Sequence, residues 1–299
     1  DVCSSDLIML NATSDCGLPV YYYVKEGNKL IACKLRGRLK KNRFSLGVGD
    51  KVDYTILEDD NGIIEEILPR TTLLERPLVA NVDQVILTFA AINPNINFNL
   101  LDKFLILAEK SALDIIICIN KVDLVDTAQL QQKLSVYYNI GYNIIMVSAE
   151  SCYNIENLRA NLKNKISVFA GPSGVGKSSI LNAISPTLKL TTGGLSEKIA
   201  RGKHTTRYAE LLTLDENSFV VDTPGFSFTE FEHILETELP YYFPEFTQFI
   251  GQCKFNTCIH DKEPNCAIKK AVEEKIITID RYNSYLQILS EILKAKKVY

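Results

Sequence analysis

The stretch GPSGVGKS, residues 171–178, constrains the fold more than any other part of this chain. It fits the pattern G-x-x-x-x-G-K-[ST] and follows the apolar run ISVF. In such a loop, glycines permit a tight turn, and backbone N–H groups surround phosphate oxygens at the N-terminus of the next helix. Lys177 would neutralise the β- and γ-phosphates, and the Ser178 hydroxyl would bind Mg²⁺. The alternative is a glycine turn beside an unrelated Lys-Ser pair. The residues expected to hold the phosphates are Gly171, Ser173, Gly174, Val175, Gly176, Lys177, Ser178 and Ser179.

Two shorter motifs indicate that the base is guanine. In NKVD, which follows the apolar run IIICI, the Asp123 carboxylate can accept hydrogen bonds from guanine N1–H and N2–H₂, a pair that adenine does not offer. Asn120 would brace this loop, and the stem of Lys121 would pack over the ring. In SAE, which ends the run NIIMV, Ser148 precedes the backbone N–H of Ala149, which would bind guanine O6. Either motif alone is equally typical of a solvated loop, but both follow predicted strands at the edge where parallel sheets bind ligands.

Two further segments would complete a magnesium site. DTPG closes the strand FVVD, so Asp222 could hold the Mg²⁺ shell through water, and the N–H of Gly225 could contact the γ-phosphate. The basic segment RGKHTTR lies between the phosphate-loop helix and the next strand. It is the expected place for a switch that orders around Mg²⁺ through the hydroxyl of Thr205 or Thr206, although an exposed loop is the alternative.

The residue after DTPG bears on hydrolysis. Many GTPases place a glutamine there to orient the attacking water, but here it is Phe226, which makes no hydrogen bond through its side chain. His204, in the basic segment, is the candidate that remains for this task. We therefore expect slow hydrolysis by the isolated protein.

The motifs run in an unusual order: NKVD, SAE, phosphate loop, switch, DTPG. This is the ordinary cycle of a GTPase cut after the DTPG strand, with the former ends joined through the predicted helix IENLRANLK. Such a circular permutation preserves the sheet and its ligand edge, because chain ends in these folds lie at the surface.

The apolar pattern divides the chain into three domains. Residues 1–70 show short alternating runs, such as VYYYVKEG and KVDYTILED, that predict a small all-β barrel or meander. Residues 71–229 alternate apolar strands with amphipathic helices, which predicts a mostly parallel sheet with helices on both faces. Residues 230–299 end in two helical runs. Residues 68–77, bracketed by prolines, are interpreted as a linker. The first seven residues, DVCSSDL, match the translation of a sequencing-adapter end, so they are set aside.

Composition excludes some classes of protein. The 299 residues include no run of 18 uncharged apolar residues and no secretory signal pattern, so we expect a cytoplasmic protein without a membrane partner. The net charge of −3 gives no overall signal for nucleic acid, but residues 34–43, KLRGRLKKNR, carry six basic side chains and no acid. This stretch is either a solvated loop or a phosphate-contacting patch.

Three of the eight cysteines cluster with a histidine near the C-terminus. Cys253, Cys258, His260 and Cys266 have the spacing C-x₄-C-x-H-x₅-C, which supplies three thiolates and one imidazole. That is a complete tetrahedral set for a structural Zn²⁺, with no position left open for water. The alternative is reduced cysteines at loop turns.

Taken together, these residues closely resemble the bacterial family of ribosome small-subunit-dependent GTPases, RsgA (YjeQ). LRGRLKK, LPRTTLLERPLVANVDQV, NKVDL, GPSGVGKSS, GKHTTR and DTPGF all fit the family pattern. The resemblance implies a multidomain α/β protein with an N-terminal OB-like β-barrel, a circularly permuted P-loop GTPase domain and a C-terminal zinc-binding helical domain. It also implies GTP hydrolysis to GDP, stimulated by the small ribosomal subunit late in the maturation of that subunit.

The resemblance assigns roles as well. His204 is implied in hydrolysis beside Lys177 and Thr206, and Thr206 is the preferred Mg²⁺ ligand. The basic stretch becomes a ribosomal RNA contact, and we expect a monomer. One alternative is a GTP-switched binding module whose hydrolysis is incidental. Another is an ATP-dependent enzyme, against which NKVD argues.

Overall fold

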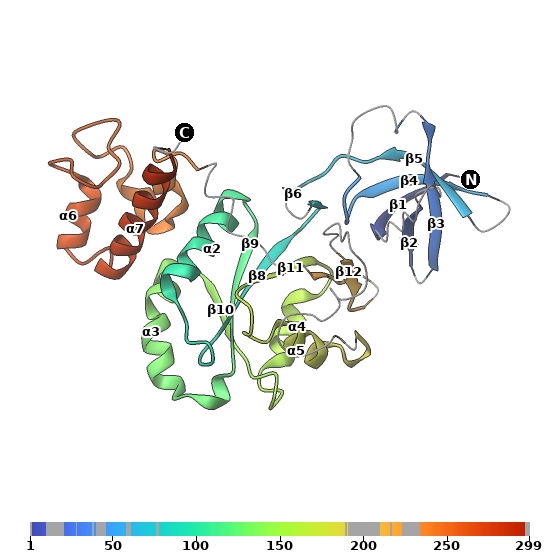
Figure 1. Ribbon diagram of the computed structural model, residues 1–299, viewed down its shortest axis with the longest axis horizontal. Helices are drawn as coiled ribbons and strands as arrows, with labels where there is room; N and C mark the ends of the chain where they lie inside the picture. The colour runs from blue at the N-terminus through green and yellow to red at the C-terminus, as the bar shows by residue number, and fades with distance from the viewer. Residues whose placement is uncertain are drawn as a thin grey trace.

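The structure is a computed structural model that describes residues 2–9, 21–27, 29–37, 39, 46–57, 61–75, 78–188, 190, 210–215, 217–222 and 234–296. A barrel, a central domain built on an open sheet and a helical C-terminal domain follow one another along the chain, with the barrel and the C-terminal domain on opposite sides of the view (Figure 1). The predicted succession of three architectures is confirmed. Among the helices of these described ranges, none combines the length and apolar character needed to cross a membrane.

The N-terminal barrel is a closed sheet in the order β1-β2-β3-β5-β4. Its strands are β1 (Val2–Met9), β2 (Tyr22–Glu26), β3 (Lys29–Leu35), β4 (Lys51–Ile56) and β5 (Asn61–Ile67). Strands β3 and β5 pair in parallel, and the other neighbours are antiparallel. Alternate residues point inward, as Val52 and Tyr54 do on β4, where both are fully buried. The alternating apolar runs therefore predicted the barrel correctly.

The first strand contains the residues that were set aside as adapter-like. Strand β1 pairs with β2 and with β4, so it closes the barrel. Residues 2–7 therefore make up most of the barrel's first strand, and their origin in a sequencing adapter remains a prediction. Strand pairing uses backbone N–H and C=O groups, which every residue except proline carries in full.

The segment between barrel and sheet is a small hairpin. Strand β6 (Leu73–Glu75) pairs antiparallel with β7 (Leu78–Ala80). Leu74 and Val79 are buried within the core of the central domain. The interpretation of residues 68–77 as a plain linker was therefore wrong, because two strands of three residues each are too short to show a period.

The central sheet has the order β10-β9-β8-β11-β13-β12. Its strands are β8 (Gln84–Ala90), β9 (Asp114–Asn120), β10 (Asn143–Met146), β11 (Ile166–Ala170), β12 (Glu210–Thr213) and β13 (Phe219–Asp222). All neighbours are parallel except the pair β12–β13. β8 and β11 are buried along their whole length, as expected for parallel strands covered on both faces.

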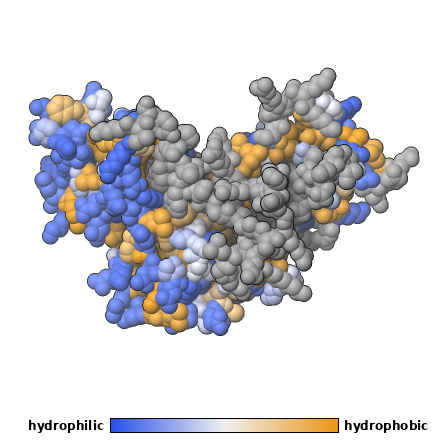
Figure 2. Space-filling view, in the orientation of Figure 1, coloured by the Kyte–Doolittle hydropathy of each residue, from blue (hydrophilic) through white to orange (hydrophobic). Residues whose placement is uncertain are grey.

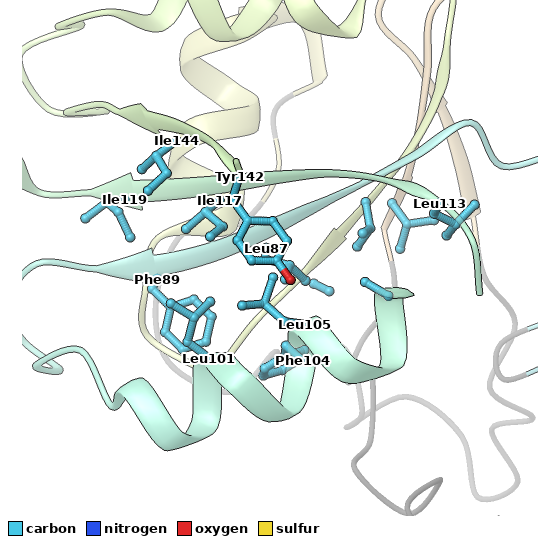
Figure 3. Close-up of a cluster of buried hydrophobic side chains, with 14 of the residues drawn as sticks. Leu87, Phe89, Leu101, Phe104, Leu105, Leu113, Ile117, Ile119, Tyr142 and Ile144 are labelled. Atoms are coloured by element: carbon cyan, nitrogen blue, oxygen red, sulfur yellow. The ribbon is translucent and has the colours of Figure 1, made fainter. Parts of the chain in front are cut away.

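Helices cover both faces of this sheet. The helices are α2 (Phe98–Lys110), α3 (Thr127–Ile140), α4 (Ile155–Leu162) and α5 (Lys177–Ile184), with short 3₁₀ turns η1 (Val122–Leu124) and η2 (Pro186–Leu188). Apolar side chains of α2 and α3 share one core with the sheet, and those of α4 and α5 share the other. On the first face, Phe104 of α2 meets Phe89 of β8 edge-on, with ring centroids 5.7 Å apart (Figure 3).

The C-terminal domain is helical and contains η5 (Leu239–Tyr242), η6 (Pro244–Phe249), α6 (Ala267–Glu273) and α7 (Ile279–Lys296). Its apolar core includes Phe243, Phe246 and Tyr285, which are fully buried. Ile106 and Leu107 of α2 belong to the same core, so this domain packs directly against the central domain.

Candidate nucleotide site and metal cluster

The phosphate loop connects β11 to α5 and depends on two glycines. Gly171 has φ +144°, and a Cβ there would lie 2.0 Å from the Thr88 carbonyl oxygen. Gly176 has φ +93°, and a Cβ there would lie 2.4 Å from Asn120 Nδ2. Any other residue at either position would combine backbone strain with a steric clash. The loop can therefore approach both the sheet and the NKVD segment only because these positions are glycine.

The remaining side chains of this loop fall into two groups. Ser173 is exposed at the tip, whereas Val175 is buried and faces the core. Ser178 is half-buried in the first turn of α5, with its neighbour Ser179. The Lys177 ammonium donates to the carbonyl oxygens of Gly171 at 2.7 Å and Pro172 at 2.8 Å, so its side chain folds back onto the first residues of its own loop.

Asn120, the last residue of β9, ties three segments together. It is 2% exposed, and its Nδ2 donates to the Val175 carbonyl at 2.9 Å. Its Oδ1 accepts the backbone N–H of Ala149 at 3.1 Å. The NKVD segment, the phosphate loop and the SAE loop are thus joined by one buried amide.

Lys121 makes a second bridge between loops. Its backbone is left-handed, with φ +63°, and its ammonium donates to the Gly174 carbonyl at 2.9 Å and to the Asn93 carbonyl. Asn93 lies in residues 91–97, between β8 and α2, a segment that the sequence analysis did not include in the site. No sequence signal could have found this contact, because its acceptor is a main-chain oxygen.

The base-reading residues differ in exposure. Asp123 is exposed on η1, so its carboxylate is free to meet a ligand edge. Ser148 is fully buried, and its Oγ accepts the backbone N–H of Ser151 at 3.1 Å, which fixes the turn of the SAE loop. The N–H of Ala149, expected to bind guanine O6, here donates to Asn120 Oδ1.

Several expected site residues lie outside the described part of the chain. They are His204, Thr205, Thr206, Gly225 and Phe226. Asp222 ends β13 beside the phosphate-loop strand β11, and only its backbone is described. The expectations for these residues remain predictions.

A second site lies in the C-terminal domain. The ligand atoms of Cys253, Cys258, His260 and Cys266 all lie within 4.8 Å of one another. His260 Nδ1 is 3.3 Å from the Cys266 sulfur, and the backbone N–H of Ala267 donates to the Cys253 sulfur at 3.3 Å. The four residues are brought together as the spacing predicted. Three sulfurs and one imidazole nitrogen are a donor set that fits a metal ion such as Zn²⁺.

The fold and these contacts define a class of protein. A phosphate loop, an NKVD motif and an SAE loop meet at the carboxyl edge of a parallel sheet, with the strands in permuted order. That combination is a circularly permuted P-loop GTPase.

Comparison with known proteins identifies the family. The family profile described as "RsgA GTPase" matches residues 67–232, and the profile described as "RsgA N-terminal domain" matches residues 17–64. The chain therefore belongs to the RsgA GTPase family, whose members hydrolyse GTP.

Relatives and solved structures agree with this assignment. The chain is 46% identical over 283 residues to "Small ribosomal subunit biogenesis GTPase RsgA" of Alkaliphilus metalliredigens, covering 94% of this chain and 97% of the relative. It is 47% identical over 281 residues to the protein of the same name from Clostridium kluyveri, with the same coverage. The structure matches "Crystal structure of YjeQ from Thermotoga maritima" with a TM-score of 0.83 and 40% identity, over 97% of this chain and 98% of the other. It also matches "The crystal structure of YloQ, a circularly permuted GTPase", with a TM-score of 0.80 and 37% identity, over 98% and 96%.

Proposed function

We propose that this chain hydrolyses GTP to GDP and phosphate in the late maturation of the small ribosomal subunit, and that the subunit stimulates its turnover. The observation that carries the nucleotide assignment is the attachment of NKVD to the phosphate loop, through Asn120 to Val175 and Lys121 to Gly174. Because the base-reading and phosphate-binding motifs share contacts, they act on one ligand. The ribosomal part is supported by the names of the relatives, which are small-subunit biogenesis GTPases.

Within this proposal, the side chains divide the work of binding. Asp123 reads the guanine edge, and the stem of Lys121 covers the ring. The loop amides surround the phosphates, and Lys177 leaves its present carbonyl acceptors for the β- and γ-phosphate oxygens. Ser178 and Thr206 would hold Mg²⁺, and Asp222 would hold it through water. When bound, Mg²⁺ neutralises charge that develops on the phosphate oxygens.

Hydrolysis then requires a positioned water. His204 would orient this water so that its oxygen forms a bond to the γ-phosphorus while the bond from phosphorus to the GDP oxygen breaks. Phe226 cannot do this through its side chain, so turnover should be slow until the subunit brings His204 into place.

For the C-terminal cluster we propose one structural Zn²⁺. Cys253, Cys258, His260 and Cys266 would occupy all four tetrahedral positions, so the ion would stabilise the domain without contacting substrate.

For the barrel we propose a ribosomal RNA contact that includes the basic stretch 34–43, of which residues 38 and 40–43 lie outside the described part of the chain. A hollow of about 580 Å³ on its surface is lined by residues that include Tyr21, Lys34, Arg36 and Leu57. The Lys34 ammonium lies 5.0 Å from the centroid of the Tyr21 ring, and Leu57 is 46% exposed. In Figure 2, hydrophobic residues show at the surface of the barrel, whereas the C-terminal domain is mostly hydrophilic. Glu65 also lines this hollow and forms an ion pair with Arg36. The Tyr21 ring, Leu57 and the Lys34 ammonium suit an unpaired nucleotide, with binding that weakens as salt rises. We also propose a cytoplasmic monomer, as a ribosomal partner requires access to the cytoplasm.

The test is GTP turnover with and without purified small ribosomal subunits, for the wild type, His204→Ala and Lys177→Ala. We expect strong stimulation of the wild type, loss of stimulation in His204→Ala with nucleotide binding retained, and loss of nucleotide binding in Lys177→Ala. Turnover that stays slow with active subunits would contradict the stimulated enzyme and favour a GTP-switched RNA- or protein-binding module instead.

A further inference from the structure

A buried arginine joins the C-terminal domain to the central domain. Arg281 of α7 is 3% exposed and forms an ion pair with Asp102 of α2, which is 2% exposed. Its Nε and Nη2 also donate to the two carboxylate oxygens of Glu245 in η6, at 2.7 and 3.2 Å. The guanidinium carbon lies 4.6 Å from the centroid of the Phe243 ring. It also lies 5.5 Å from the centroid of the Tyr137 ring, so two carboxylates and two rings hold this buried guanidinium in place.

The Asp102 carboxylate also binds helix α3, in addition to Arg281 of α7. The hydroxyl of Tyr137, in α3, donates to Asp102 Oδ1 at 2.8 Å, the oxygen that also accepts from Arg281. The Tyr137 ring stacks on Phe98, the first residue of α2, with centroids 5.9 Å apart. Arg281 of the C-terminal domain therefore lies at the contact between α2 and α3 of the central domain.

Both of these helices begin just after loops of the nucleotide site. α2 follows residues 91–97, and α3 follows NKVD and η1. From the helix cap Asn97 to Asp102 is five residues, or about 7.5 Å of helix at 1.5 Å per residue. The two loops meet at Lys121, whose ammonium binds carbonyls of residues 93 and 174. The loop before α2 and the loop before α3 are thus in direct contact, and the second of them also contacts the phosphate loop.

We propose that Arg281 and Asp102 are positioning residues for the nucleotide site. Through Asp102 and Tyr137 they hold α2 and α3 in a fixed position relative to each other. This keeps residues 91–97 and the phosphate loop in contact with Lys121 of the NKVD loop. The C-terminal domain is then part of what retains GDP and GTP, although no residue of it that the structure describes belongs to the nucleotide site. This inference rests on the proposed nucleotide site.

The chain offers a matched control at the same interface. Lys103 of α2 pairs with Glu291 of α7 at 2.7 Å, so it joins the same two helices by one ion pair. Unlike Arg281 and Asp102, this pair is not linked to Tyr137 of α3. A change at Lys103 therefore weakens the domain contact without releasing α3.

The experiment measures release of a fluorescent GDP analogue by stopped flow, with the melting temperature of each variant recorded. We expect Arg281→Met to release the analogue about tenfold faster than the wild type, and Tyr137→Phe, which removes only one hydroxyl, about threefold faster. Lys103→Met should stay within about twofold of the wild type. If Arg281→Met does not fold, Tyr137→Phe and Asp102→Asn carry the test.

The outcomes separate this inference from the proposed function. Equal release rates for the wild type and folded Arg281→Met and Tyr137→Phe variants would overturn the inference alone. It would equally be overturned if Lys103→Met accelerated release as much as they do, because the effect would then reflect only a weaker interface. A wild type that binds no GDP analogue would overturn both.

Discussion

The two outer domains are both attached to the central domain by polar and apolar contacts, but the polar contacts differ in kind. At the barrel, Val48 in the loop before β4 is buried in the core of the central domain, and Asn81 Nδ2 donates to the Gly49 carbonyl at 2.9 Å. Asp50 fixes this loop by accepting from Gly47 N–H at 2.7 Å and from Arg70 Nε at 2.6 Å. At the other end, Leu107 of α2 is buried among the apolar side chains of the C-terminal domain, and the buried Arg281–Asp102 ion pair joins the same two domains. A neutral hydrogen bond can be exchanged for bonds to water at little net cost, whereas breaking a buried ion pair leaves charges without compensation. The barrel is therefore the domain that can be repositioned more cheaply.

Of the changes that distinguish the two outer domains, removal of the metal should have the largest effect on stability. A strong chelator is expected to unfold the C-terminal domain, because a structural Zn²⁺ contributes on the order of 10 kcal/mol to such a site. Limited proteolysis should then cut within residues 234–296 and leave the barrel and the sheet intact. Cys152→Ser, at an exposed cysteine outside the cluster, should behave as the wild type does. An unchanged digestion pattern in metal-free protein would refute the zinc assignment.

The next largest effect should come from removing apolar packing between α2 and the C-terminal domain. Leu107→Ala should lower the free energy of unfolding by about 3 kcal/mol, because it leaves a cavity between α2 and the C-terminal domain. Leu105→Ala, on the face of α2 that packs in the core of the central sheet, should cost a similar amount. Only Leu107→Ala should also speed proteolysis of residues 234–296. Equal protection of that region in both variants would show that apolar packing does not hold the domain.

The polar contacts of Asp50 at the barrel should contribute less stability than the packing of Leu107. Asp50→Asn removes a charge from a fully buried position, and we expect a loss of about 2 kcal/mol because the partly exposed Arg70 can turn to water. The loss should change little as salt is added, as should the loss in Leu107→Ala, because ions screen a buried pair far less than an exposed one. Urea unfolding at two salt concentrations measures both, with Asp53→Asn on β4 as the control. If Asp50→Asn lowered the free energy of unfolding more than Leu107→Ala does, the barrel contact would be the stronger of the two.

The smallest effect is a pH dependence near the C-terminal attachment. Burial raises the pKa of Glu109 above its ordinary 4.5, although the Tyr142 hydroxyl, which donates to it at 2.9 Å, opposes the shift. Because the folded pKa is the higher one, the stabilising contribution is complete below pH 4.5 and is lost as pH rises through the folded pKa. Glu109→Gln should therefore gain stability relative to the wild type across that window, by less than about 1 kcal/mol. Urea unfolding between pH 4 and 8 measures the difference in free energy of unfolding between Glu109→Gln and the wild type. A difference that does not change with pH would contradict this prediction.

The sequence predicted those parts of the site whose residue types carry the chemistry. The glycines and lysine of residues 171–178 and the cysteines and histidine of the metal cluster are recognisable because few other residues could serve. The contact of Lys121 with the carbonyl of Asn93 was not predictable, because main-chain acceptors leave no trace in composition. The Arg281–Asp102 pair spans 179 positions, and each residue alone is typical of the polar face of an amphipathic helix. The hairpin β6–β7 was missed because its strands are too short for a period.

Strand order also determines what a ribosome releases first when it synthesises this chain. β8, β9 and β10 emerge together and can pair at once, but β8 must later accept β11 on its other side. Until residue 170 has left the exit tunnel, the growing chain carries a half-sheet whose open edge is a strand buried along its whole length in the finished protein. Such an edge invites pairing with other chains. Once β11 has paired, its own far edge is open in turn until β13 emerges, so the permuted order keeps a core strand at the edge of the nascent sheet until residue 222 is released.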